Sequence, residues 1–361
     1  RIYERMHWVP YDTIPAIHWA NWTKGIVRCY NAACLWQCGI LFREVGRMSE
    51  EVRSPEVVCV GILVADVIAH PVREMPKRGQ LALVDEMVTH VGGCAANTGI
   101  GLSRLGVPTG VAGKAGDDAF GDFVEKTLEK NGVDTRALVR DTQTKTSGTM
   151  VMVSEDGERS FIHYMGANAE LTYEDLDIDY ILQARLLHVA GTFVMTKFDG
   201  EPTSRLLKLA RERGVITCRD TVFDAQGRWM SILKDSLPHL DYFVPSLEEA
   251  KRIANREEPE EVAQVLIDHG VKTVGLKMGD EGCYLRSGNE SVRLPALKVD
   301  AVDATGAGDA FAAGFLTGVV KGWDLEKTGR FANAVGACCV QAVGTTAGLK
   351  SFEETMKMME H

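Results

Sequence analysis

The chain has 361 residues, of which 45% are hydrophobic and 25% are charged, enough to bury the core of one large domain or two. Its net charge of -10 excludes a general electrostatic attraction to nucleic acid or to an anionic membrane, so we expect neither as a partner. No stretch reaches the roughly 18 apolar residues of a membrane-spanning helix, and nine cysteines in a chain of this length suit reduced, buried thiols in a cytoplasmic protein better than a disulfide framework.

Residues 1–47 differ in composition from the rest of the chain. They hold four of the six tryptophans and three of the nine cysteines, and they show no sustained helical or strand period. The following residues, Met48-Ser49-Glu50-Glu51, look like an ordinary protein beginning. We therefore predict an N-terminal extension over residues 1–47 that is not part of the fold, and a folded domain over residues 48–361.

From Val57 onward, short apolar runs alternate with amphipathic segments. The first run, residues 57–64, is continuously apolar, which indicates a strand buried on both faces of a parallel sheet. This alternation predicts an α/β fold with helices on both faces of a mostly parallel sheet. The expected strands are 57–64, 110–112, 186–190, 215–218, 242–244 and 273–276, and the expected helices are 95–105, 120–130, 202–213, 246–255, 259–268, 310–321 and 325–343.

Two segments, residues 80–90 and 146–164, break this alternation and indicate antiparallel strands. The second contains a Ser154-Glu155-Asp156-Gly157 turn between runs in which apolar and polar residues alternate. Because helices already cover the predicted sheet, we expect these strands to form a small β lid, from inserted segments at about 66–91 and 146–168. Such a lid can close on a small substrate and exclude water. An edge hairpin that only packs, or a dimer contact, is an alternative use that is compatible with the first.

Two groups of polar residues accompany the first expected strand and the first expected helix. Asp66 follows the strand at the edge where open α/β sheets bind ligands, although a solvated loop aspartate would look the same. Further along, Gly92 and Gly93 permit close approach of the backbone before the helix. The Asn97 amide can both donate hydrogen bonds to a polyol and accept them.

Residues 302–314 carry the strongest chemical signal. Gly306, Ala307 and Gly308 leave the backbone N–H groups at a helix start uncrowded, which favours the binding of phosphate oxygens. Asp309 then places a carboxylate beside that pocket, close enough to accept the proton of a hydroxyl that attacks phosphorus. A simple helix cap is the alternative role of Asp309.

The pattern Asp-x-Thr-Gly-Ala-Gly-Asp-x-Phe at residues 303–311 resembles the second signature of the ribokinase-like (PfkB) carbohydrate kinases. Residues 92–97 resemble the sugar-binding Gly-Gly-x-x-x-Asn element of the same family, and residues 113–121 match its companion signature, Gly-x-x-Gly-x-Asp-x-x-Gly. The resemblance implies a ribokinase-like three-layer sandwich with a mostly parallel central sheet and a small β lid. It also implies ATP-dependent phosphorylation of a hydroxyl on a small sugar or sugar acid, as in fructokinases, 2-keto-3-deoxygluconate kinases and ribokinases.

The resemblance further implies roles for individual residues. Asp309 is expected to be the catalytic base, and the amides of Gly306, Ala307, Gly308 and Asp309 are expected to form an anion hole. The residues expected to bind substrate are Asp66, Gly92, Gly93, Asn97 and Asn168. Those expected to bind the nucleotide are Lys277, Gly279, Gly282 and Asn333.

The expected cofactors are ATP, Mg²⁺ and a monovalent cation. Glu249 is expected to act on magnesium indirectly, although Ser246 stands where the family has an asparagine. Asp303 and Thr305, with backbone oxygens near Gly344, are expected to bind potassium, which hard oxygen ligands suit better than a transition metal. The alternative for Asp303 is a bond to loop amides alone.

The sequence leaves several candidates for the molecule that accepts the phosphoryl group. Ribokinases usually carry Asn and Lys at the positions of Val64 and Cys94, which argues against ribose. A nucleoside kinase on the same scaffold is one alternative, and a non-catalytic sugar or nucleotide sensor is another, although a sensor would not need Asp309. We also expect a homodimer formed through the lid.

Overall fold

The computed structural model describes residues 54–360, and the predicted extension over residues 1–47 lies outside them. The strands of the central sheet lie in the order β13 (Glu290–Leu294), β12 (Cys283–Ser287), β11 (Thr273–Lys277), β10 (Tyr242–Phe243), β9 (Ile216–Thr221), β8 (Leu186–Thr192), β1 (Val57–Gly61), β4 (Thr109–Gly116) and β5 (Asp134–Asp141). Neighbouring strands from β11 to β5 are parallel, and β12 and β13 add an antiparallel edge. Every residue of β1, β4 and β8 is buried, as expected for strands that are covered on both faces.

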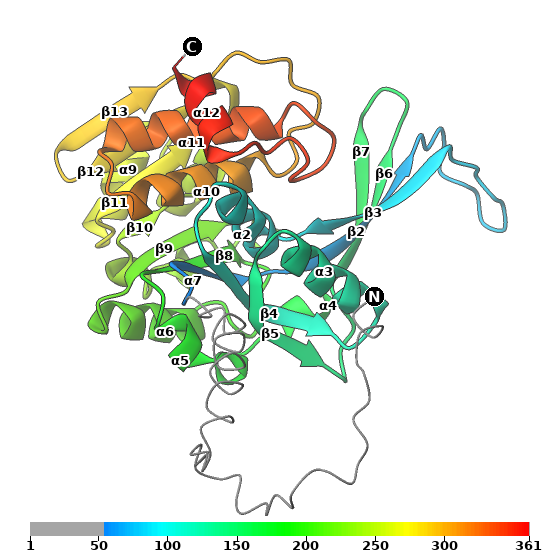
Figure 1. Cartoon of the computed structure of the whole chain (residues 1–361), viewed down its shortest axis with the longest axis horizontal. Helices are drawn as coiled ribbons and strands as arrows, with labels where there is room; N and C mark the ends of the chain where they lie inside the picture. The colour runs from blue at the N-terminus through cyan, green and yellow to red at the C-terminus, as the bar shows by residue number, and fades with distance from the viewer. Residues whose placement is uncertain (1–53, 361) are drawn as a thin grey trace, which may run out of the picture. The chain divides into compact units, whose positions relative to one another are not determined.

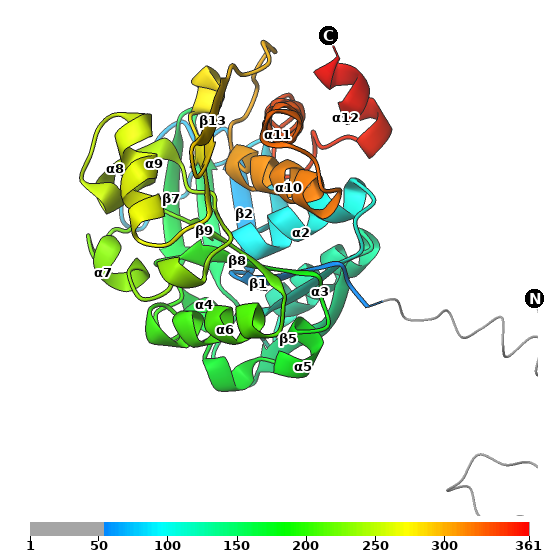
Figure 2. The same cartoon turned by 90° about the vertical axis from the view of Figure 1, so that its left-hand side faces the viewer.

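Helices cover both faces of the sheet, which confirms the predicted three-layer α/β fold (Figure 2). One apolar core contains residues of α2 (Cys94–Arg104), α3 (Ala119–Lys130), α10 (Ala307–Val320), α11 (Leu325–Cys339) and α12 (Phe352–Met359). The other core contains residues of α5 (Ile178–Ile181), α6 (Glu201–Glu212), α7 (Met230–Leu233), α8 (Leu247–Ala254), α9 (Pro259–Asp268) and the 3₁₀ helices η3 (Tyr173–Asp175) and η4 (Leu237–His239). None of the described helices is long and apolar enough to cross a membrane.

Local signals in the sequence explain where the helices begin. The predicted helices are all present, because their apolar residues recur every three or four positions and face a core. α8 begins after Ser246, which forms a capping box with Glu249. α10 begins at Ala307, three residues earlier than predicted, so the glycine-rich stretch is the first turn of the helix and not a loop before it.

The apolar run over residues 57–64 is not one strand, which corrects the prediction. β1 ends at Gly61, and β2 (Val64–His70) belongs to a second sheet with the strand order β3 (Glu86–Gly92), β2, β6 (Gly148–Val153) and β7 (Arg159–Tyr164). This second sheet projects from the body of the molecule as the predicted lid (Figure 1). Asp66 therefore lies on a lid strand. The break was hidden because residues on both sides of it are apolar and buried.

Some elements do not follow from the apolar runs. The edge strand β5 and the β12–β13 hairpin carry polar residues along their length and have no continuous apolar run. The short helix α4 (Gly166–Ala169) and the 3₁₀ helix η5 (Gly279–Glu281) are too short for a helical period to be visible.

Candidate active site

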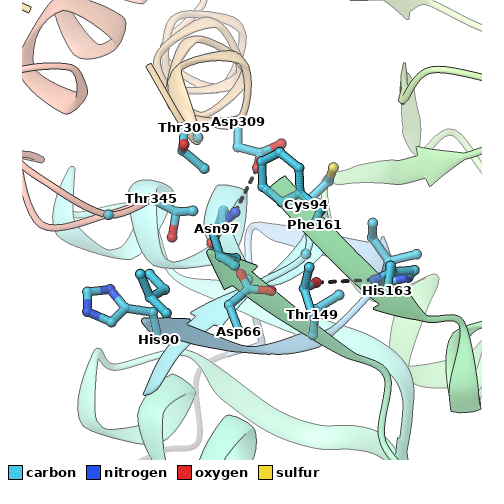
Figure 3. A pocket seen from close by; sticks show the side chains of 18 of the residues that line it. Asp66, His90, Cys94, Asn97, Thr149, Phe161, His163, Thr305, Asp309 and Thr345 are labelled. Carbon is cyan, nitrogen blue, oxygen red and sulfur yellow. Dashed lines mark hydrogen bonds between the residues drawn. The ribbon is translucent and has the colours of Figure 1, made fainter. Parts of the chain in front are cut away.

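A cavity of about 280 Å³ lies between the lid sheet and the first turn of α10 (Figure 3). Its walls come from the lid strands, from the turn that leads into α2, and from two loops that precede and follow the α10–α11 pair. The cavity therefore brings together most of the predicted acceptor, catalytic and cation-binding residues. The predicted residues that line it are Asp66, Gly92, Gly93, Asn97, Asp303, Thr305, Gly306, Asp309 and Gly344.

The lid contributes one face of its sheet to the cavity. Successive residues of a strand point to opposite faces, and residues paired across strands share a face. Thr149 pairs with His163 and Val151 pairs with Phe161, so these side chains face the cavity together with Arg159. Sequence reasoning missed Arg159, Phe161 and His163: the alternation along the hairpin places them on one face, but it does not show that this face points to the cavity.

Asp66 marks the lid end of the cavity. A Cβ atom on Gly92 would lie 2.1 Å from Asp66 Oδ2, so only a glycine leaves room for the carboxylate in this position. Burial raises the pKa of Asp66, while a hydrogen bond from Thr149 and the charges of His163 and His90 lower it in part. Asp66 can thus accept hydrogen bonds from hydroxyl groups within the cavity.

Asp309 marks the opposite end. Its Oδ2 atom accepts a hydrogen bond of 2.8 Å from Asn97 Nδ2 (Figure 3). Burial raises the pKa of Asp309, while the Asn97 hydrogen bond, the charge of Lys277 and a hydrogen bond from Cys94 lower it in part. A carboxylate with a raised pKa is a better proton acceptor than an ordinary aspartate.

Asn97 lies between Asp66 and Asp309 in the cavity (Figure 3). The residue is 4% exposed, and its Oδ1 atom has no hydrogen-bond partner among the described residues. Buried polar atoms are rarely left without a partner, because the loss of hydration is then uncompensated. Asn97 Oδ1 is therefore available to accept a hydrogen bond from a ligand hydroxyl while Nδ2 holds Asp309.

The first turn of α10 presents free backbone N–H groups. Gly306 has a φ of 81°, and a Cβ atom there would lie 2.6 Å from the carbonyl oxygen of Thr345, so this position requires glycine. Ala307 N–H donates to the Ala304 carbonyl. Within residues 54–360 the N–H groups of Gly308 and Asp309 have no acceptor, as is usual at the start of a helix. They can bind an anionic oxygen.

The ammonium group of Lys277 lies beside this turn. A Cβ atom on Gly308 would lie 3.4 Å from Lys277 Nζ, which also binds Asp220 Oδ2 over 2.6 Å. Burial raises the pKa of Asp220 to about 7, against the opposing effect of the Lys277 charge. Sequence reasoning missed Asp220, although its place near the carboxyl end of a parallel strand was an available signal.

Asn168 and Glu249 are two of the predicted residues that do not line the cavity; the others are Ala307, Gly308, Lys277, Gly279, Gly282 and Asn333. The Asn168 amide accepts from Leu63 N–H and donates to Leu63 C=O, each over 3.0 Å, and so holds the chain where it passes from β1 to β2. Glu249 accepts hydrogen bonds from the Thr221 hydroxyl (2.8 Å) and from Ser246 N–H (3.2 Å). Contact of either side chain with a ligand stays a prediction.

Two of the predicted nucleotide-binding residues, Gly282 and Asn333, lie against the end of β13 and the residue that follows it. A Cβ atom on Gly282 would lie 2.1 Å from the Leu294 carbonyl oxygen, and Asn333 Nδ2 donates to the Pro295 carbonyl oxygen over 3.0 Å. Gly279, in contrast, has open space around it. These residues shape the loop between β13 and α10, and their contact with a nucleotide stays a prediction.

The predicted site for a monovalent cation contains an arginine. Asp303 is 5% exposed, and its Oδ2 atom accepts from Gly344 N–H over 2.7 Å. Its Oδ1 atom accepts from Thr305 N–H over 2.8 Å and lies 2.7 Å from Arg159 Nη1. Arg159 also donates to the Thr305 hydroxyl. The residues as arranged do not fit a metal cation on this carboxylate oxygen, because a guanidinium group already lies there.

These contacts also act on the charge of Asp303. Burial alone would raise the pKa of Asp303, but hydrogen bonds from Arg159, Gly344 and Thr305 outweigh it and lower the pKa to about 2. The carboxylate is therefore charged at neutral pH. No group of three or more His, Cys, Asp or Glu side chains within residues 54–360 is placed to hold a metal ion.

The arrangement suits transfer of a phosphoryl group to a hydroxyl. Such a transfer needs little covalent chemistry from the protein, which must align the reacting groups and stabilise charge on the transferred oxygens. Asp309 can accept a proton, and the N–H groups of Gly308 and Asp309 with the Lys277 ammonium can stabilise negative charge.

Known proteins resemble this chain over most of its length. The sequence profile of the pfkB family carbohydrate kinase matches residues 54–351. An uncharacterized sugar kinase of Archaeoglobus fulgidus is 31% identical over 69% of this chain and 98% of its own length. The probable chloroplastic fructokinase-6 of Arabidopsis thaliana is 30% identical over 83% of this chain and 81% of its own length. The structure of Arabidopsis thaliana ribokinase complexed with ribose and ATP gives a TM-score of 0.74 at 25% identity, covering 86% of this chain and all of that one.

Proposed function

Because this chain belongs to the pfkB family of carbohydrate kinases, we propose that it transfers the γ-phosphoryl group of ATP to a hydroxyl of a small sugar or sugar acid, with Asp309 as the base. One observation carries the residue assignment. Asp309 is fixed by Asn97 at 2.8 Å and lies in the same helix turn as the free N–H groups of Gly308 and Asp309. A proton acceptor and an anion-binding pocket thus adjoin each other, as in-line transfer requires.

The acceptor would lie between Asp66 and Asp309. Asp66 would accept hydrogen bonds from sugar hydroxyls at the lid end, and the free Oδ1 atom of Asn97 would accept one in the middle. Asp309 would accept the proton of the attacking hydroxyl. Because Asn97 holds Asp309 through its other amide atom, binding and alignment of the hydroxyl depend on the same side chain.

The phosphoryl group would bind at the side of the cavity formed by the first turn of α10. The N–H groups of Gly308 and Asp309 would hold its oxygens, and Lys277, anchored by Asp220, would add positive charge beside them. Preorganised donors of this kind stabilise the transition state without further rearrangement. Magnesium bound with the nucleotide would neutralise phosphate charge, and Glu249 is the residue we assign to act on it indirectly.

A nucleoside acceptor is the second candidate, and the apolar part of the lid favours it. Ile68, Val151 and Phe161 line the cavity side by side, and Phe161 is 60% exposed. An exposed aromatic ring over a cavity can stack on a base, whereas a simple sugar makes less use of it. A sensor that binds the same ligands without turnover would use the same walls.

A coupled assay of ADP release across hexoses, sugar acids and nucleosides tests the proposal. We expect turnover with one of these classes, and we expect Asp309→Asn to lower kcat by about a hundredfold or more while nucleotide binding persists. Asp268→Asn, at the end of α9, removes a distant carboxylate and should leave kcat unchanged. Near-normal kcat in Asp309→Asn would exclude it as the base, and ligand binding without turnover would favour the sensor.

A further inference from the structure

Arg159 spans the cavity from the lid to the phosphate-binding side. It is the first residue of β7, and its side chain points to the same face of the lid as Phe161. The guanidinium group binds Asp303 Oδ1 over 2.7 Å and also donates to the Thr305 hydroxyl. The ion pair is sheltered from solvent, since the Arg159 side chain is 23% exposed and the Asp303 side chain 2%.

Asp303 holds together the two loops that support the anion pocket. Its carboxylate accepts from Thr305 N–H in one loop and from Gly344 N–H in the other. These loops touch where Gly306 meets the Thr345 carbonyl, directly before the first turn of α10. The carboxylate therefore fixes the position of the N–H groups that are proposed to bind the phosphoryl group.

A buried carboxylate in this role requires a nearby positive charge. Within residues 54–360, Arg159 is the cationic side chain that forms an ion pair with Asp303. A guanidinium group stays charged over the whole physiological pH range and carries several donors in one plane, so a single group can bind both Asp303 and Thr305. Backbone N–H groups alone would leave the net charge of Asp303 uncompensated.

We propose that Arg159 takes the place of a monovalent cation in this protein, so that the lid and not potassium completes the support of the anion pocket. The inference rests on the proposed function. Arg159 is a positioning residue that acts through Asp303. Because Arg159 and Phe161 share one face of β7, closure of the lid over the acceptor and fixation of the anion pocket would be the same event.

Dependence on the cation tests this proposal. With an accepted substrate, potassium chloride would replace choline chloride at constant ionic strength. We expect the kcat of the wild type to change less than about twofold and that of Arg159→Ala to fall by about 10- to 100-fold without potassium, the size seen for residues that orient a site indirectly. Added potassium or guanidinium ions should restore part of the kcat of Arg159→Ala, because the deleted side chain leaves space beside Asp303.

A second readout does not depend on turnover. If Asp303 is already neutralised, potassium should not raise the thermal unfolding midpoint of the wild type relative to choline, whereas it should raise that of Arg159→Ala. Arg73→Ala is the matched control on the same lid. Arg73 pairs with Glu155 over 2.7 Å, and neither residue lines the cavity, so this variant should behave like the wild type in both measurements.

Three results would overturn the proposal: strong activation of the wild type by potassium, an unchanged kcat in Arg159→Ala, or a folded Arg159→Ala that neither cation restores. A wild type that turns over none of the acceptors would contradict the proposed function instead. In that event the unfolding midpoints still decide whether Arg159 or potassium neutralises Asp303.

Discussion

Groups around the Asp309 carboxylate act on its pKa in opposite directions. Burial raises the pKa, whereas Asn97, Lys277 and Cys94 lower it in part, and the net shift is upward. A base accepts a proton only in its ionised form, so the proposed reaction should slow as the pH falls through this pKa. The acid limb of the rate profile should therefore lie at a higher pH than the ordinary pKa of an aspartate would give.

Asn97→Ala tests this relation. The substitution removes the hydrogen bond that favours the charged form of Asp309, so the pKa should rise further and the acid limb of kcat should move to higher pH. The profile of kcat against pH at saturating substrate measures the shift. Cys94→Ala removes a weaker donor and should move the limb in the same direction by less. An acid limb that stays in place in Asn97→Ala would contradict Asp309 as the titrating base.

How well the sequence predicts the role of a residue in the site depends on how close its partners lie along the chain. Gly306 and Asp309 were predictable because both lie in one short stretch at the start of α10. The pairing of Asp220 with Lys277 was not, because the two residues are 57 positions apart and only the parallel sheet brings them together. Arg159, beside a hairpin turn, looks like a solvated arginine until the fold places Asp303 against it.

For the β6–β7 hairpin, the sequence predicts the strands but not which face of the hairpin points to the cavity. Its alternating pattern and its turn predict two antiparallel strands, and both are present. The pattern does not show which side faces the cavity, because both sides carry large apolar residues. Val151 and Phe161 face inward, while Met150 and Ile162 pair on the opposite face.

Substitutions of the neighbours Phe161 and Ile162 distinguish the role of the inner face of the lid hairpin in acceptor binding from that of its outer face. The side chains are similarly exposed, at 60% and 55%, but Phe161 lines the cavity and Ile162 does not. We expect Phe161→Ala to raise the KM of the acceptor by about tenfold or more, as expected for loss of an apolar contact of this size. Ile162→Ala should leave that KM unchanged in the same steady-state assay. Equal effects on KM would show that the lid does not bind the acceptor through its inner face.

The outer face of the lid, the face of its sheet that points away from the cavity, carries exposed apolar side chains and bears on how the molecule assembles. Met87, Met150, Ile162 and Tyr164 are between 53% and 64% exposed there. Strand pairing brings Met150 beside Ile162 and places Tyr164 opposite Gly148 on the same hairpin. Clustered apolar side chains on a projecting sheet are typical of a protein–protein interface, and a sheet of this kind can pair with its own copy about a two-fold axis. The homodimer through the lid stays a prediction, and this surface is where we expect the two copies to meet.

Ile162→Glu tests the dimer and its link to the active site. We expect sedimentation equilibrium to give about twice the 39.5 kDa chain mass for the wild type and a single chain mass for the variant, because a buried glutamate would lose its hydration without a partner. Phe223→Glu, which alters an exposed aromatic residue outside the lid strands, should stay dimeric. A wild type of single chain mass, or a dimeric Ile162→Glu, would exclude this interface. If the partner supports the hairpin that carries Arg159, the monomeric variant should also show a lower kcat. The outer face of β7 would then contact the partner subunit, while its inner face holds Arg159 against Asp303 and closes the lid over the cavity.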